Sequence, residues 1–216
     1  MSPYPRAEER CRMVERQIEA RGIHNPRVLA AMREIPRHFF IPPPYDQSAY
    51  EDNPLPIGNG QTISQPYIVA LMTELLRPEP SDNVLEIGAG SGYQAAILSR
   101  LVHRLTTMER ISAVAILARN NLKLLGIGNV EVIEGDGTQG YLQNAPYNGI
   151  IITAATPEIP RMLTDQLADR GRLVAPVGGR DIQELVTLEK QGNRLIPEYH
   201  GGVRFVPLIG KHGWEN

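Results

Sequence analysis

The segment from Val84 to Tyr93 constrains this chain most, because it joins an apolar stretch to a helical pattern through closely spaced glycines. Val84 to Ile87 is apolar apart from Glu86, and helical spacing resumes at Tyr93. A strand, a glycine loop and a helix in this order begin a nucleotide-binding βαβ unit. The dinucleotide fingerprint G-x-G-x-x-G would need a glycine at 93, where this chain has tyrosine. The spacing therefore disfavours NAD, and a purely structural glycine turn is the alternative.

The glycine spacing resembles the first motif of S-adenosylmethionine-dependent methyltransferases. The motif here is Glu86, then Gly88, Gly90 and Gly92. Glycine lets the backbone approach the methionine part of that cofactor closely, and the N-terminus of the next helix favours its carboxylate. Glu86 would face a ligand that carries both a sulfonium and an ammonium. We expect these four residues to bind the cofactor.

Length and composition suit one domain with a sizeable core. The chain has 216 residues, of which 42% are hydrophobic. We expect a single domain over 1–216, with an N-terminal helical arm and substrate loop over 1–66 and the core over 67–216. The net charge of −2 contains no long run of one sign, so neither a nucleic acid nor a membrane is an expected partner.

Cysteine content and apolar patterning indicate the cellular compartment in which such a chain is expected. Cys11 is the only cysteine, which forbids an internal disulfide and offers no thiolate cluster for a metal. No signal-peptide pattern or membrane-length apolar run is present in the sequence. We expect a cytoplasmic monomer without a metal.

The hydrophobic pattern alternates between strand-like and helix-like segments. Helices are expected over 7–21, from 26 to before 36, and over 65–76, 93–101, 111–124 and 159–167; strands over 84–87, 104–109, 130–134, 150–153, 172–177, 182–190, 195–199 and 203–208. This order predicts an α/β fold, a doubly wound, mostly parallel, seven-stranded Rossmann-like methyltransferase sheet with an antiparallel edge. Residues 36–66 read as a long ordered loop. Ser64 is placed to cap the helix that follows.

Acidic residues end consecutive predicted strands, where ligands bind in open α/β sheets. Glu109 stands 17 residues after Gly92 and can accept hydrogen bonds from both ribose hydroxyls. Asp136, followed by Gly137, ends the next strand at the position that borders adenine in methyltransferases. Surface or capping roles are the alternative for each residue alone. Together they favour a nucleoside-containing cofactor.

Three acceptor types can be compared with the residues present. Methylation of an adenine amine usually goes with an Asn/Asp-Pro-Pro-aromatic motif, which the segment from Thr153 to Pro157 lacks. Methylation of a hydroxyl needs a base or a metal. The histidines are scattered and are expected in surface or packing roles: His24, His38, His103, His200 and His212.

A carboxylate acceptor needs neither a base nor a metal. Its pKa is about 4, so it is ionised at neutral pH. It requires donors that align it with the methyl group and exclude water. Thr62, Ser64 and the backbone N–H groups near Gly58 and Gly60 form a candidate anion cradle. The residues alone therefore favour carboxyl methylation modestly.

The segment from Ala49 to Pro66 resembles the signature loop of the protein-L-isoaspartate (D-aspartate) O-methyltransferase family. The resemblance extends through Val84–Tyr93, Gly135–Gly137, Gly171–Gly178 and Val203–Leu208, nearly the whole chain. One departure is Asn148, where the family commonly has an aspartate after the tyrosine.

The resemblance implies a repair enzyme that methylates the free α-carboxylate of isoaspartyl residues in damaged proteins and peptides. The ester would close to a succinimide, whose hydrolysis returns some normal aspartate. Ser64 matches the family's active-site serine and Thr62 its neighbour, so both would orient the substrate. The backbone at Ile63 and the hydroxyl-bearing Ser64 would also contact the cofactor, and Val206 would line the peptide groove. A small-molecule or RNA methyltransferase and a non-catalytic binding module are the rivals.

Overall fold

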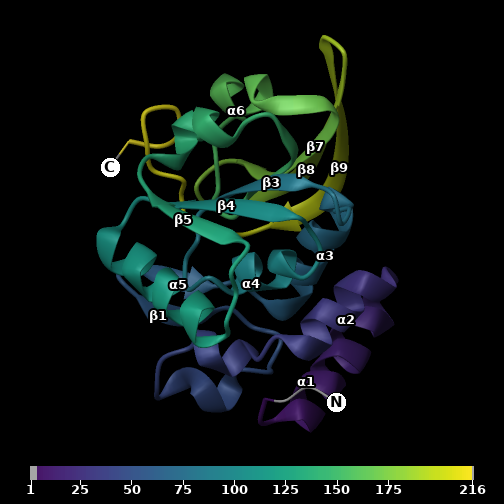
Figure 1. The fold of residues 1–216 in the computed structure, drawn as a ribbon, viewed down its shortest axis with the longest axis vertical. Helices are drawn as coiled ribbons and strands as arrows, with labels where there is room; N and C mark the ends of the chain where they lie inside the picture. The colour runs from purple at the N-terminus through teal and green to yellow at the C-terminus, as the bar shows by residue number, and fades with distance from the viewer. Residues whose placement is uncertain (1–3, 216) are drawn as a thin grey trace.

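The computed structural model describes residues 4–215, which are built around one seven-stranded sheet (Figure 1). The strand order is β5-β4-β3-β6-β7-β8-β9. All pairs from β5 to β7 are parallel, whereas β8 pairs antiparallel with both β7 and β9. The strands are β3 Asn83–Ile87, β4 Arg104–Glu109, β5 Val130–Glu134, β6 Tyr147–Ile152, β7 Leu167–Gly178, β8 Gln183–Gln191 and β9 Arg194–Val203. The predicted mostly parallel sheet with an antiparallel edge is confirmed.

Helices cover both faces of this sheet, but unequally. They are α1 Ala7–Met13, α2 Pro26–Glu34, α3 Pro66–Leu76, α4 Tyr93–Ser99, α5 Ser112–Leu124 and α6 Arg161–Asp165. In the view of Figure 1, α3, α4 and α5 lie below the sheet and α6 above it, with α1 and α2 further below. The arm predicted at the N-terminus therefore packs on the side that holds the longer helices.

Alternation of side chains along the strands produces two buried clusters. In β3, Val84 belongs to the cluster with α3, α4 and the arm, while Leu85 belongs to the cluster with α6. In β6, Ile151 belongs to the first cluster and Ile150 to the second. Apolar residues on both faces are expected for parallel strands that are covered on both sides.

The N-terminal arm follows its predicted boundaries closely. The first helix continues beyond α1 as a π turn, Val14–Ile18, and a 3₁₀ turn that ends at Gly22, whose φ is +93°. Asn25 caps α2, since its side-chain oxygen accepts hydrogen bonds from the amides of Arg27 and Val28. Helices that start with a cap and a first-turn proline are stabilised locally.

The segment predicted as one long loop contains a β-hairpin, which is the largest difference from the expectation. Its strands are β1 Leu55–Gly58 and β2 Gln61–Ile63, paired antiparallel. The turn residues Asn59 and Gly60 both have positive φ, 52° and 71°. Asn-Gly is a strong signal for a two-residue hairpin turn. The apolar residues Leu55 and Ile57 in β1 and Ile63 in β2 were therefore a strand signal, although the many polar and turn residues of the segment favoured the prediction of a loop.

The strand predicted over 203–208 is wrong. β9 ends at Val203, and the chain then crosses the carboxyl end of the sheet near β6. The amide of Leu208 donates to the carbonyl of Ala155, and Pro207 forms an isolated bridge with the same residue. Proline has no N–H to donate to a ladder, so it ends regular pairing here.

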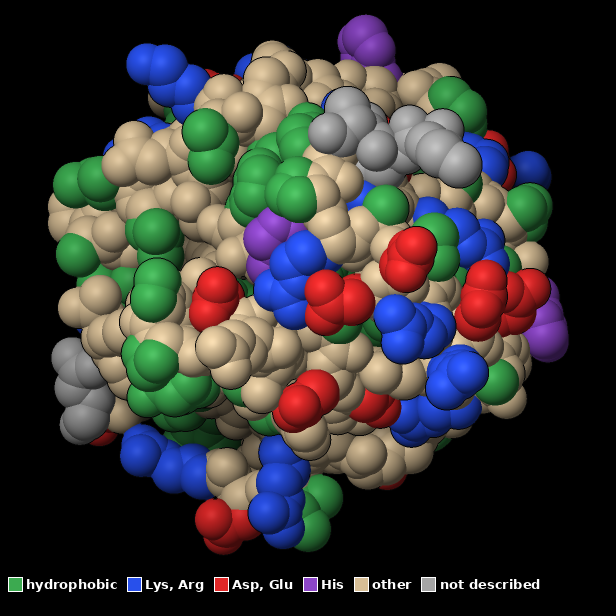
Figure 2. Space-filling view, turned by 90° about the horizontal axis from the view of Figure 1, so that it is seen from below, with side chains coloured by type: hydrophobic (Ala, Val, Ile, Leu, Met, Phe, Trp, Pro, Cys, Tyr) green, Lys and Arg blue, Asp and Glu red, His purple; other side chains and the backbone are tan. Residues whose placement is uncertain are grey.

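Charges of both signs are interspersed on the face that carries the arm, as Figure 2 shows. Several of them form surface ion pairs, among them Arg33 with Glu19 and Arg21 with Asp52. Within residues 4–215, none of the helices has the length and apolar character needed to cross a membrane.

Candidate active site

Two hollows meet at the carboxyl end of the parallel strands. The first, which we call the cofactor pocket, runs along the glycine loop and contains Gly88, Gly90 and Glu109. The second, which we call the groove, has a volume of about 750 Å³ and contains Ile68, Arg180 and Phe205. Both are lined by the same four residues: Thr62, Ser64, Thr153 and Val206. A group held in one hollow would therefore meet a group held in the other beside these four residues.

The glycine loop needs glycine for two different reasons. Gly88 has a φ of +98°, and a Cβ atom there would lie 2.5 Å from Oγ1 of Thr153. Gly90 has a φ of +54° and lines the cofactor pocket. At Gly92, a Cβ atom would meet the backbone of Ala118 at 3.4 Å. That is an ordinary van der Waals distance, so glycine is favoured at 92 by its φ of +89°; Gly92 lines neither hollow, unlike Gly88 and Gly90.

Glu109 lies where a ribose-binding carboxylate was predicted. One oxygen accepts a hydrogen bond from the amide of Gly90 at 3.1 Å, and the other from the amide of Ile111 at 3.0 Å. The side chain thus braces the glycine loop against the start of α5. Each oxygen retains a lone pair that can accept from a ribose hydroxyl. Glu109 also lines the adjoining hollow with Gly137, Met108 and Leu208, which continues the cofactor pocket.

Glu86 lies beneath the site rather than in it. The side chain is fully buried, and it stands in register with Thr107 of β4 on the face covered by α3 and α4. Neither carboxylate oxygen has a hydrogen-bond partner among the described residues. Burial raises the pKa of Glu86 to about 8, so the group is largely protonated at neutral pH. Direct contact with a cationic cofactor, as predicted from the motif, has no support in this geometry.

Asp136 holds the C-terminal segment, while its neighbour Gly137 lines the hollow that adjoins the cofactor pocket. One oxygen of Asp136 accepts from the amide and hydroxyl of Thr138, and the other from the amide of Lys211 at 2.8 Å. Burial disfavours the charged form, but these hydrogen bonds outweigh it and lower the pKa of Asp136. Gly137 lines the hollow beside Glu109. Of the two residues expected to border adenine, Gly137 lines this hollow, whereas the Asp136 side chain is engaged by Thr138 and Lys211.

Thr62, Ile63 and Ser64 come to the junction from β2 and the turn after it. Ile63 is buried and lines the cofactor pocket. The hydroxyls of Thr62 and Ser64 form no hydrogen bond within residues 4–215. Both are therefore available to a ligand. Gly58 and Gly60, predicted as part of the anion cradle, lie instead at the hairpin end and line neither hollow.

Ser64 is not the cap of α3, contrary to the sequence-based expectation. The N-cap is Gln65, whose own side chain does not cap the helix. Asp52 takes that part: its Oδ1 accepts from the amide of Tyr67 at 3.2 Å, and its Oδ2 accepts from the Gln65 side chain at 2.6 Å. A carboxylate from a distant segment thus leaves the Ser64 hydroxyl free.

Val206 and Thr153 complete the junction. Val206, which was predicted to line a peptide groove, lines both hollows, but its carbonyl already accepts from the amide of Ala155 at 2.8 Å. Thr153 was missed by sequence reasoning. Its hydroxyl lies within hydrogen-bond distance of the carbonyls of Ile87 and Gly88, at 2.9 and 2.6 Å. The available signal was its place directly after β6, at the ligand-binding end of the sheet.

Candidate proton acceptors are sparse at this junction. Among residues 4–215, Asp181 is the only one with a side-chain carboxylate that lines the groove, and Glu109 the only one in the cofactor pocket. The histidines His24, His38, His103, His200 and His212 line neither hollow. Residues 4–215 contain no cluster of three or more His, Cys, Asp or Glu side chains that could hold a metal.

The strand order, the glycine loop and the bracing carboxylate define a nucleotide-cofactor methyltransferase of the Rossmann-like α/β class. Solved structures agree: a protein-L-isoaspartate O-methyltransferase superposes with a TM-score of 0.85 at 30% identity, over 96% of this chain and 67% of that one. A Plasmodium falciparum structure, described as a beta-aspartate methyltransferase in complex with S-adenosyl-L-homocysteine, has a TM-score of 0.80 at 25% identity, over 93% and 98% of the two chains.

The chain belongs to the protein-L-isoaspartate(D-aspartate) O-methyltransferase family, whose profile matches residues 8–213. A protein-L-isoaspartate O-methyltransferase from Methanoregula boonei is 69% identical over 215 residues, covering 100% of this chain and 99% of that protein. One from Methanospirillum hungatei is 62% identical over 97% of each chain. The family resemblance drawn from the signature loop is therefore confirmed.

Proposed function

We propose that this protein is a repair methyltransferase that transfers a methyl group from S-adenosyl-L-methionine to the free α-carboxylate of L-isoaspartyl residues in proteins and peptides. The ester then closes to a succinimide without the enzyme, and hydrolysis returns part of it to normal aspartate. Membership of the family and 69% identity to a protein-L-isoaspartate O-methyltransferase support the activity.

The observation that carries the proposal is the junction of the two hollows. A cofactor beside the glycine loop and a peptide in the groove would meet at Thr62 and Ser64, which line both. Neither hydroxyl is engaged by another residue of the described chain. Two free hydroxyls at the meeting point suit an acceptor that needs hydrogen-bond donors.

The residues present fit S-adenosylmethionine as the methyl donor. Gly88 and Gly90 let the backbone approach it, Glu109 has lone pairs for the ribose hydroxyls, and Gly137 lies beside the adenine end. When bound, the cofactor supplies an electrophilic methyl group on its sulfonium. The fully buried Glu86 lies outside this set.

The chemistry then depends on orientation. An isoaspartyl α-carboxylate has a pKa of about 4, so it reaches the site already ionised and needs no base. The hydroxyls of Thr62 and Ser64 donate to its oxygens and hold one of them in line with the methyl group. Such positioning can lower a barrier by about 7–11 kcal/mol. The scarcity of proton acceptors at the junction is consistent with this route.

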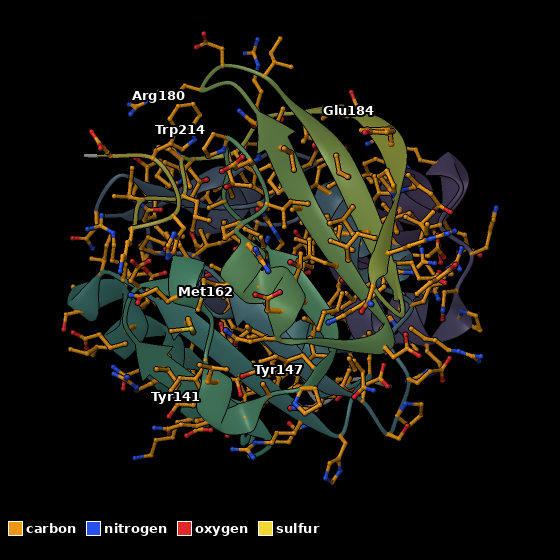
Figure 3. The ribbon with its side chains drawn as sticks, turned by 90° about the horizontal axis from the view of Figure 1, so that it is seen from above. Tyr141, Tyr147, Met162, Arg180, Glu184 and Trp214 are labelled. Atoms are coloured by element: carbon orange, nitrogen blue, oxygen red, sulfur yellow. The ribbon has the colours of Figure 1, made fainter. Side chains whose placement is uncertain are left out.

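The groove is suited to an extended peptide. Ile68, Val203 and Phe205 provide apolar contacts, and the exposed Arg180 and Arg204 add positive charge. The guanidinium of Arg180 lies 5.0 Å from the ring centre of Trp214. Both side chains are labelled in Figure 3. Because the Val206 carbonyl is occupied, we infer that its N–H is the backbone group left for the substrate.

A paired peptide assay tests the proposal. An isoaspartyl peptide and the matched aspartyl peptide are incubated with cofactor labelled on its methyl group. The expected result is base-labile label in the isoaspartyl peptide alone. Equal labelling of both peptides, or labelling of neither, would reject the substrate assignment. Tight binding of S-adenosylhomocysteine without transfer to any isoaspartyl peptide would instead support a binding module.

The organisation of the chain follows from the same proposal. We treat 1–216 as one domain, with 1–66 as arm and substrate loop and 67–216 as cofactor core. Its support is one buried cluster that joins Met13 and Phe40 of the arm to Tyr93 and Leu185 of the core. We propose a cytoplasmic monomer, and the free Cys11 suits a reducing compartment.

A further inference from the structure

Arg37 is a fully buried cation whose contacts converge on the substrate loop. It lies in the helical turn Arg37–Phe40 of the arm. Its guanidinium donates to the carbonyl of Ala49 at 2.5 Å, of Asn53 at 3.1 Å and of Ser64 at 3.0 Å. Ala49 and Asn53 precede the hairpin, and Ser64 follows it. One side chain therefore fastens both ends of the segment that carries the two free hydroxyls.

Arg37 makes these contacts as a charged group. Burial lowers its pKa to about 10, which leaves the guanidinium protonated at neutral pH. It forms no salt bridge with any carboxylate within residues 4–215. Hydrogen bonds from a charged donor are roughly twice as strong as neutral ones. Its positive charge is therefore directed at the three backbone carbonyls of Ala49, Asn53 and Ser64.

The same side chain also faces the cofactor pocket through Tyr93. The guanidinium carbon lies 5.8 Å from the centre of the Tyr93 ring, and Tyr93 begins α4 and lines the cofactor pocket. Phe40, three residues later, packs against that ring with centres 5.4 Å apart. Arg37 thus contacts both the substrate loop, at Ser64, and the wall of the cofactor pocket, at Tyr93.

We propose that Arg37 is a positioning residue for methyl transfer, holding the Ser64 carbonyl and thereby aiming the Ser64 hydroxyl at the acceptor carboxylate. The inference rests on the proposed methyltransferase function. Arg37 lines neither hollow, so any effect on the reaction passes through the residues that it contacts, of which Ser64 lines both hollows and Tyr93 lines the cofactor pocket. A shift of about 1 Å in a positioning group can cost about 100-fold in rate.

Arg10 provides a matched control in the same arm. It is also fully buried, it also leaves one guanidinium nitrogen unpaired, and it also makes three hydrogen bonds. Its partners are the carbonyls of Arg33 and Pro5 and the hydroxyl of Tyr50, none of which lies in the 54–64 segment. Loss of either arginine should destabilise the fold, whereas only Arg37 should affect catalysis.

The test compares Arg37→Met and Arg37→Lys with Arg10→Met and Arg10→Lys in the full chain, at a temperature where circular dichroism shows every variant folded. For Arg37→Met we expect kcat on an isoaspartyl peptide to fall by about 10–100-fold, with unchanged affinity for S-adenosylhomocysteine by calorimetry. Arg37→Lys, which can still reach one carbonyl, should recover part of the rate. Arg10→Met should keep the wild-type kcat.

Amide hydrogen exchange over residues 59–66 supplies a readout independent of turnover. We expect faster exchange in the Arg37 variants than in the Arg10 variants. Equal kcat in Arg37→Met and Arg10→Met, or equal loop exchange, would overturn the positioning role. Arg37→Lys decides the matter if Arg37→Met does not fold. Inactive wild-type protein would reject the proposed function itself, while the exchange comparison would still show whether Arg37 holds the loop.

Discussion

At the scale of single residues, freedom from internal hydrogen bonds distinguishes the hydroxyls proposed to hold the substrate from the carboxylates that support the site. The hydroxyls of Thr62 and Ser64 have no partner within the described residues, whereas Glu109 and Asp136 are engaged by backbone amides. A free donor in a pocket wall can bind a ligand without first breaking a bond. Engaged carboxylates instead preserve the shape of the site.

The Ser64→Ala variant should separate orientation from cofactor binding. Removing one donor to the reacting group typically costs about 10²–10³ in rate. We expect kcat on an isoaspartyl peptide to fall by that order, with little change in the affinity for S-adenosylhomocysteine. Ser81→Ala, at an exposed site outside both hollows, serves as the control. An unchanged kcat in Ser64→Ala would remove this serine from the mechanism.

Glu86 should make stability depend on pH. Burial raises its pKa in the folded protein to about 8, from an ordinary value of 4.5. Between these values the folded state binds a proton that the unfolded chain lacks, so the free energy of unfolding falls as pH rises. Each pKa unit corresponds to about 1.4 kcal/mol.

The Glu86→Gln variant should lose this dependence, because an amide does not titrate. Urea unfolding of both proteins without cofactor, at pH 5.5 and pH 8.5, measures the difference. We expect the wild type to lose more stability than the variant between the two pH values. Parallel losses would show that Glu86 ionises in the folded protein as easily as in the unfolded chain.

At the scale of elements, the substrate loop owes its shape to partners from other segments. Asp52 accepts from the amide of Tyr67 at the start of α3 and from the side chains of Gln65 and Arg21. Arg37, a cation, holds the same loop by donating hydrogen bonds to the carbonyls of Ala49 and Ser64. The hairpin between them carries its own turn signal in Asn59 and Gly60. Local sequence therefore contains a signal for the hairpin turn, which the prediction of a loop did not use, and contains no signal for how the hairpin is held over the site.

The Asp52→Ala variant should weaken the start of α3. Loss of a capping carboxylate typically costs about 0.5–2 kcal/mol, so the thermal midpoint should fall by several degrees. Asp52→Asn retains an acceptor for the amide of Tyr67 and should lose less stability. Differential scanning calorimetry distinguishes the two variants. Equal midpoints for Asp52→Ala and wild type would show that this capping contact contributes nothing.

At the scale of the whole molecule, the arm and the core share one buried cluster. Met13, Ile18 and Phe40 of the arm belong to the same cluster as Val84 and Leu185 of the sheet. Contacts of this extent couple the two parts energetically. The arm should therefore unfold together with the core.

The Phe40→Ala variant tests that coupling. Phe40 is buried against Tyr93, and truncating such a ring typically costs about 3–5 kcal/mol. Trp214 is the only tryptophan and lies in the distant C-terminal segment, so its fluorescence reports on the core. We expect the Trp214 transition and the circular dichroism transition to shift together. A Trp214 midpoint that stays at the wild-type value would contradict a single cooperative domain.

The sheet, the glycine loop and the family could all be predicted from the amino-acid sequence. Each rests on short-range patterns: apolar stretches of strand length, glycines where φ is positive, and acidic residues at strand ends such as Glu109. Periodicity and turn chemistry act between near neighbours, so they are readable without coordinates.

Which of the candidate residues line the site depends on contacts between segments that are far apart in the sequence. The Glu86 side chain points away from the site because successive side chains of β3 point to opposite faces of the sheet. The Asp136 side chain accepts a hydrogen bond from the amide of Lys211, 75 positions away, and is therefore already engaged. Thr153 entered the site because β6 ends beside the glycine loop, and Ser64 stayed free because Asp52 caps α3 in its place. Such assignments depend on which distant groups compete for the same hydrogen bond, and that competition exists only once the chain has folded.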